Sequence, residues 1–124
     1  MNVPFVIAAA ALAMAAPEAA STPPAVVPIA LYSYGYTPTP IVLHAGQPVT
    51  LRLENRSGSG HSFKAPQFFA SARMLNGAVQ DGDIHIKGGQ SASVTLVPAA
   101  GTYPLHCSHF MHDTMGMHST IYVR

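Results

Sequence analysis

The run from Val49 to Asn55, VTLRLEN, alternates strictly between apolar and polar residues. This alternation is typical of a strand that buries one face and exposes the other. Similar short runs, rich in β-branched and aromatic residues, recur along the chain between turns that draw on its 10 glycines and 11 prolines. The pattern predicts strands over residues 27–36, 41–44, 49–55, 81–87, 91–98, 102–107 and 118–124.

One segment has a helical pattern instead. Residues 66–75, PQFFASARML, open at a proline and close near Asn76-Gly77, which are typical helix start and stop signals. Many short strands with Gly/Pro turns and a single small helix indicate an all-β protein. We therefore expect a Greek-key antiparallel β-sandwich with one short helix.

The 124 residues are enough for one domain with a single core. At the N-terminus, the apolar run over residues 3–16 is too short to span a bilayer and ends in small residues. We predict a signal peptide over residues 1–20, followed by a domain over 21–124 that is exported to the periplasm or the extracellular space. Once the leader is removed, no stable membrane insertion is expected.

The charge pattern narrows the class of partner. Only 9% of the residues are charged, and the formal net charge is +1. There is no basic cluster and no run of like charges, which argues against a nucleic-acid partner. The chain has one cysteine, so it cannot form an intramolecular disulfide. That cysteine is either a buried, inert side chain or a metal ligand.

The segment from Gly101 to Met117, GTYPLHCSHFMHDTMGM, concentrates potential metal ligands. Cys107, His112 and Met117 follow one another at intervals of five residues. A thiolate, an imidazole and a thioether form a soft ligand set that suits copper, and a second imidazole completes a blue-copper site. His61, in the run GSGHSF, is the candidate for that second imidazole.

A second assignment of the ligands stays open. His109 also follows Cys107 closely, and it could replace His112 with Met115 or Met117 as the thioether. We also expect Ser62, next to His61, to hydrogen-bond to the backbone near Cys107 and so stiffen the site.

These motifs resemble the cupredoxin family. The resemblance rests on GTYPLHC, on the C-x4-H-x4-M spacing, and on AGQPVTLRLEN followed by GHSF. The ligand loop is similar to those of rusticyanin and of the type 1 sites of multicopper oxidases. The resemblance favours His112 over His109, because Gly116-Met117 then falls where rusticyanin-like loops place the axial ligand. The loop departs from many members in having Phe110-Met111 where they have Pro-Gly. The resemblance implies one type 1 copper bound by His61, Cys107, His112 and Met117, and one-electron transfer.

These features bear on three functions. The preferred one is an electron carrier, acting as a monomer, whose neutral loop around Phe110, Met111 and Met115 docks transiently with a redox partner protein. The alternative is a module for copper handling or storage, because further histidines and methionines surround the predicted site. An enzyme is not expected. The cupredoxin resemblance implies that an oxidase needs H-x-H motifs, which this chain lacks, and it has Ser108 where an oxidase has histidine.

Overall fold

The computed structural model describes residues 4, 23–109 and 115–124. Apart from residue 4, the predicted leader lies outside this part of the chain, as do residues 110–114. The elements, in chain order, are β1 (Ala25–Tyr32), β2 (Gly35–Thr37), β3 (Ile41–Leu43), β4 (Val49–Asn55), β5 (His61–Lys64), α1 (Pro66–Ser71), β6 (Arg73–Asn76), β7 (Asp83–Ile86), β8 (Ser91–Val97), β9 (Gly101–His106) and β10 (His118–Val123).

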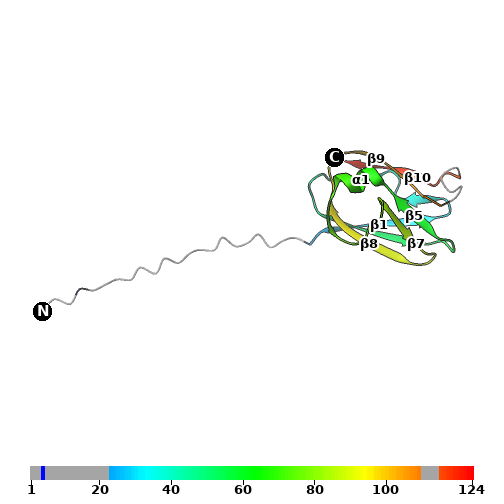
Figure 1. The fold of residues 1–124 in the computed structure, drawn as a ribbon, viewed down its shortest axis with the longest axis horizontal. Helices are drawn as coiled ribbons and strands as arrows, with labels where there is room; N and C mark the ends of the chain where they lie inside the picture. Colours follow the sequence, from blue (N-terminus) through cyan, green and yellow to red (C-terminus); the bar gives the residue numbers. More distant parts are fainter. Residues whose placement is uncertain (1–3, 5–22, 110–114) are drawn as a thin grey trace.

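The strands form two five-stranded sheets that face each other (Figure 1). One sheet has the order β2-β1-β4-β8-β6, and the other has the order β3-β10-β9-β5-β7. In Figure 1, β9 and β10 lie in the upper layer, and β1 and β8 lie in the lower one. The predicted β-sandwich with one short helix is confirmed.

The sheets are mixed, whereas an antiparallel arrangement was predicted. β1 pairs with β4 in parallel, with Val27 opposite Leu51, and β10 pairs with β3 in parallel, with Ile121 opposite Ile41. The remaining strand pairs are antiparallel. A parallel pair requires a crossover between its strands, and periodicity within one strand carries no information about the direction of its neighbour.

The helix is shorter than predicted. It covers Pro66–Ser71 rather than residues 66–75, and the backbone of Ala72 is already extended. Residues Arg73–Asn76 form β6, which pairs with the edge of β8. The apolar spacing in this stretch fits a helix, but its backbone gains ladder hydrogen bonds by joining the sheet, and that tertiary pairing outweighs local propensity.

Two strand predictions also need correction. The first predicted strand, 27–36, is divided into β1 and β2 by a turn, and these two strands pair with each other antiparallel. No strand was predicted at His61, yet His61–Lys64 forms β5 in the second sheet. Four residues after a Gly/Ser-rich bend are too few to show a strand period.

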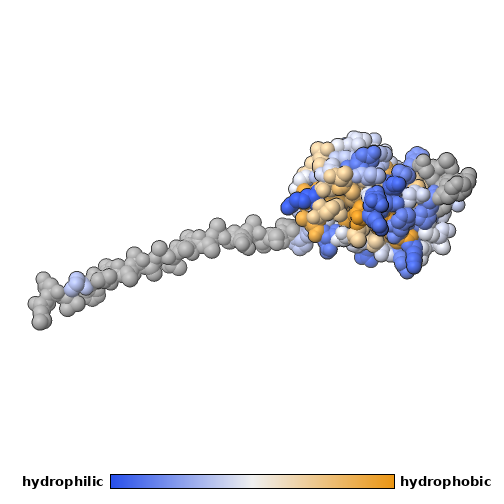
Figure 2. Space-filling model, viewed as in Figure 1, coloured by the Kyte–Doolittle hydropathy of each residue, from blue (hydrophilic) through white to orange (hydrophobic). Residues whose placement is uncertain are grey.

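The core lies between the sheets and is closed on one side by Phe68 and Phe69 of α1. The strictly alternating strand β4 behaves as predicted, with Val49, Leu51 and Leu53 buried. On the face shown in Figure 2, strongly hydrophilic residues lie beside an apolar area rather than covering the surface evenly. Within the part of the chain that the structure describes, no helix has the length and apolar character needed to cross a membrane.

Candidate metal centre

Cys107 and Met117 lie side by side because β9 and β10 are neighbours in the sheet. Cys107 directly follows β9, and Met117 directly precedes β10, whose His118 pairs with His106. The backbone N–H of Cys107 donates a hydrogen bond to the carbonyl oxygen of Met117 over 3.1 Å. Both side chains are buried. The sheet therefore brings the thiol and one thioether to the same interior end of the sandwich.

His61 comes to the same place from β5. Its side chain is fully buried, and Nδ1 lies 4.0 Å from Sγ of Cys107. The other ring nitrogen, Nε2, lies 2.9 Å from Oγ of Ser33, in the turn between β1 and β2. When Nε2 carries the ring proton and donates it to Ser33, Nδ1 keeps a lone pair on the side of the thiol.

The distance between these two atoms fits a shared metal ion. Bonds of about 2.3 Å to sulfur and about 2.05 Å to nitrogen, meeting at about 120°, place the two ligand atoms about 3.8 Å apart. The observed separation of Nδ1 in His61 and Sγ in Cys107 is 4.0 Å. A thiolate, an imidazole and a nearby thioether are donors that favour copper.

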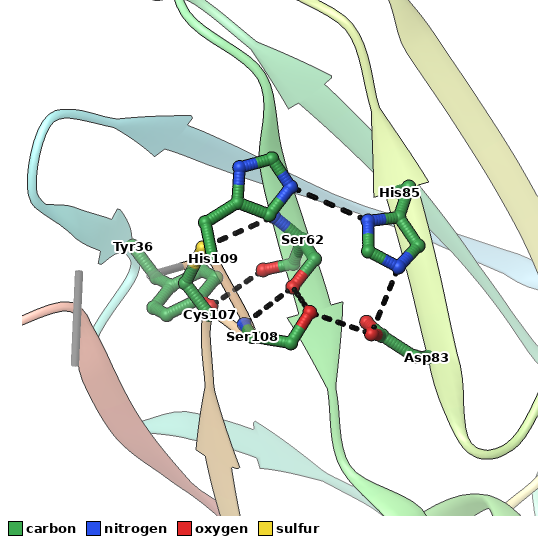
Figure 3. Close-up of polar contacts among 7 residues, drawn as sticks. All are labelled: Tyr36, Ser62, Asp83, His85, Cys107, Ser108 and His109. Atoms are coloured by element: carbon green, nitrogen blue, oxygen red, sulfur yellow. Dashed lines mark hydrogen bonds and ion pairs between the residues drawn. The ribbon is translucent and has the colours of Figure 1, made fainter. Parts of the chain in front are cut away.

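Ser62 connects the two segments that carry these side chains (Figure 3). Its backbone N–H donates to Sγ of Cys107 over 3.3 Å. Its Oγ accepts a hydrogen bond from the backbone N–H of Ser108 over 2.7 Å. Its carbonyl oxygen accepts one from the hydroxyl of Tyr36, also over 2.7 Å. The predicted bond between Ser62 and the backbone near Cys107 is confirmed, and Ser62 contacts both the thiol and the backbone that follows it.

Asn55, at the end of β4, supports the bend that leads to His61. Its side chain is buried, and its Nδ2 donates to the carbonyl oxygens of Ser59 and Ile86 over 2.8 and 2.9 Å. Its Oδ1 accepts from both the backbone N–H and the hydroxyl of Ser57. The Gly/Ser-rich bend before β5 is therefore fixed by one amide that contacts it and the end of β7.

A polar chain leads from Ser62 to the surface (Figure 3). Oγ of Ser108 lies 2.9 Å from Oγ of Ser62 and donates to Oδ2 of Asp83 over 2.7 Å. The same carboxylate oxygen lies 3.1 Å from Nε2 of His85, and Nδ1 of His85 lies 3.3 Å from Nε2 of His109. The His109 ring also lies close to His61, with 6.4 Å between the ring centroids.

The structure thus brings together three of the four predicted ligands, His61, Cys107 and Met117. The fourth, His112, lies outside the described residues, as do Phe110 and Met111 of the predicted docking loop. The supporting roles of Ser33 and Asn55 were not predicted. Asn55 ends a strictly alternating strand on its buried side, and a polar residue at a core position was a usable signal.

The comparisons with known proteins agree with this architecture. A family model described as "Cupredoxin-like domain" matches residues 4–123. No relative was found among curated proteins.

Solved structures supply further matches. An auracyanin from Roseiflexus castenholzii is 20% identical, with a TM-score of 0.61, and the match covers 80% of this chain and 96% of that one. Auracyanin A from Chloroflexus aurantiacus, described as a "blue" copper protein, is 20% identical, with a TM-score of 0.59 and coverage of 82% and 99%. A multicopper oxidase from Campylobacter jejuni is 14% identical, with a TM-score of 0.63, but this chain covers only 30% of it.

At identities of 14–20%, these solved structures show that this chain shares their fold and nothing more. The family is shown by the sequence model, which matches nearly the whole chain. This protein belongs to the cupredoxin-like domain family.

Proposed function

We propose that this protein carries single electrons between redox partners outside the cytoplasm, through one type 1 copper ion bound by His61, Cys107, His112 and Met117. The observation that carries the proposal is the approach of Nδ1 in His61 to Sγ in Cys107, at 4.0 Å between two buried side chains, with the buried Met117 hydrogen-bonded to Cys107 through its backbone. Cupredoxin-like family membership and the fold shared with the auracyanins support the choice of copper.

The chain's own contribution is to hold the ligands before any metal arrives. Ser33 orients the His61 ring, and Ser62 holds the Cys107 thiol and the following backbone. Copper, when bound, supplies the Cu(II)/Cu(I) couple. A ligand set that cannot rearrange freely is suited to fast electron exchange, because neither oxidation state has to rebuild its surroundings.

The surface beside His61 supports docking of a partner protein. Tyr34 is 38% exposed, and its ring meets that of His61 edge-on, with 6.2 Å between the centroids. Met115, two residues before the proposed axial ligand, is 53% exposed. Exposed apolar side chains near a redox centre suit a transient interface with a partner protein. We propose that the protein is a monomer when it docks.

The proposal is tested by titrating the protein with Cu(II) while recording its visible absorption spectrum. We expect an intense thiolate-to-copper band that saturates at one equivalent and is absent from the Cys107→Ser variant. The loaded protein should then pass through repeated cycles of chemical reduction and oxidation without releasing copper.

The ligand assignment has its own matched pair of variants. His112→Ala should lose the intense band, while His109→Ala should retain it. Copper uptake without this band, or copper held only as Cu(I) and lost on oxidation, would overturn the electron-transfer proposal in favour of copper handling or storage.

A further inference from the structure

Two imidazoles outside the proposed copper ligands face each other at the surface (Figure 3). Nδ1 of His85, in β7, lies 3.3 Å from Nε2 of His109, which follows β9. Their rings lie 28° from parallel, with 5.4 Å between the centroids. The His85 side chain is 64% exposed, so water can reach the pair. From these observations, we propose that His85 and His109 form a second metal site, which binds zinc or a zinc-like divalent cation.

Asp83 prepares His85 for this role. Its Oδ2 lies 3.1 Å from Nε2 of His85, and its side chain is only 9% exposed. A nearly buried carboxylate favours the tautomer in which Nε2 carries the proton and donates it. Nδ1 then keeps its lone pair on the side of His109. A histidine that ligates a metal commonly donates its second ring nitrogen to a carboxylate in this way, which orients the ring and strengthens it as a ligand.

The carboxylate is itself anchored. Oδ2 of Asp83 accepts a hydrogen bond from the hydroxyl of Ser108 over 2.7 Å. Asp83 and His85 are both in β7, which pairs with β5. The carboxylate of Asp83, which belongs to the same strand, therefore fixes the orientation of the His85 ring.

The distance between Nδ1 of His85 and Nε2 of His109 fits tetrahedral coordination of zinc. Zinc binds imidazole nitrogen at about 2.0–2.1 Å, and two such ligands at a tetrahedral angle lie about 3.3–3.4 Å apart. The observed spacing is 3.3 Å. In the absence of a cation the two nitrogens share a hydrogen bond, and the cation would take the place of that proton.

Water would complete the coordination. Among residues 4, 23–109 and 115–124, no group of three or more His, Cys, Asp or Glu side chains is placed to hold a metal. The described residues therefore supply two ligands, His85 and His109, and the exposed side of His85 leaves room for water. A cation bound here would connect β7 to the beginning of the loop that carries the copper ligands. The inference concerns residues outside the proposed copper set, and it rests on the proposed assignment of His112 rather than His109 to copper.

The test uses the full chain, first loaded with one equivalent of copper so that zinc cannot enter that site. Zn(II) is then titrated by calorimetry, and the histidine ring signals of the reduced protein are followed by NMR. We expect one equivalent of zinc to bind and to shift the signals of His85 and His109. The affinity should fall by about tenfold or more in His85→Ala and in His109→Ala, since each loses one of two protein ligands. His44→Ala, at an exposed position after β3, is the matched control and should bind zinc as the wild type does.

Three results would overturn the inference. The first is wild-type protein that binds no zinc at millimolar concentration. The second is zinc binding that persists unchanged in either histidine variant. The third is loss of the blue absorption band in His109→Ala, which would make His109 a copper ligand. The blue band and the zinc titration are separate readouts, so failure of the copper proposal and failure of this one are distinguishable.

Discussion

The hydroxyl oxygen of Ser33 lies 2.9 Å from Nε2 of His61, although the two residues are 28 positions apart in the chain. Ser33 belongs to the turn between β1 and β2 in one sheet, and His61 begins β5 in the other. The contact therefore spans the sandwich at the end where the thiol lies. It leaves Nδ1 of His61 facing Sγ of Cys107, which is the arrangement a metal ligand needs.

Replacing Ser33 should loosen the metal centre without removing a ligand. In Ser33→Ala the His61 ring loses the partner that orients it, and we expect copper affinity to fall by about tenfold, at the lower end of the usual range for such supporting residues. Competition with a Cu(I) chelator measures this change. Ser91→Ala, at an exposed position of β8, is the matched control and should leave the affinity unchanged. Equal affinities in both variants would show that Ser33 does not position the ring.

Ser62→Ala should reduce the stability of the metal-free protein. The variant removes the oxygen that accepts the backbone N–H of Ser108 in a partly buried position. Leaving such a donor without a partner costs about 1–3 kcal/mol. Urea unfolding measures this loss, and Ser93→Ala, at another exposed position in β8, should change the free energy of unfolding by less than about 0.5 kcal/mol. A Ser62→Ala variant as stable as Ser93→Ala would contradict the expectation.

Asn55 is expected to contribute more to the free energy of unfolding than Ser62, because its one side chain satisfies several hydrogen-bonding groups. In Asn55→Ala the carbonyl oxygens of Ser59 and Ile86 lose their donor, and Ser57 loses its acceptor. We expect a loss on the order of 3 kcal/mol in the free energy of unfolding, together with weaker copper binding, since the bend before His61 is no longer fixed.

Asn55→Asp separates the contribution of the amide oxygen of Asn55 from that of its N–H donors. Aspartate keeps the oxygen that accepts from Ser57 but loses both N–H donors and adds a charge at a buried position. It should therefore be at least as destabilising as alanine. If thermal or urea unfolding showed Asn55→Asp to be nearly as stable as the wild type, the two donated hydrogen bonds would not be what holds the bend.

The sequence predicted the sandwich, and it predicted that Cys107 and Met117 lie close together, because both depend on local patterns. The alternation of β4 reports its buried face, and Cys107 and Met117 frame a single loop between paired strands. What the patterns missed depends on contacts between distant segments. The parallel pairing of β1 with β4 and the bond from Ser33 to His61 are set by the packing of whole sheets, and no periodicity within either segment encodes them.

The length of the helix was misjudged for a related reason. Residues 72–76 have side chains that a helix would accept, but Arg73 and Met74 pair with Val97 and Leu96 at the edge of β8. Met74 and Leu75 remain partly exposed there, so burial did not decide between helix and strand. The available partner strand decided it, and that partner is known only once the sheet has formed.

Met117→Leu should change the redox properties of the loaded protein more than its stability. Met117 is fully buried, and leucine of similar volume should cost less than about 1.5 kcal/mol. The blue band should remain, because the thiolate and both imidazoles are kept. The reduction potential should rise, because a weak thioether donor stabilises Cu(II) more than Cu(I), and leucine offers no donor.

Met115→Leu provides the matched comparison, since Met115 is 53% exposed and lies in the same loop. Spectroelectrochemical titration of the two variants measures both potentials under the same conditions. We expect a rise for Met117→Leu and no change for Met115→Leu. The reverse pattern would assign the axial thioether to Met115, and with it the spacing in which His109 rather than His112 binds copper. This pair of variants therefore identifies the axial thioether. Because His109 could also bind copper together with Met117, the second imidazole is identified separately, by comparing His112→Ala with His109→Ala.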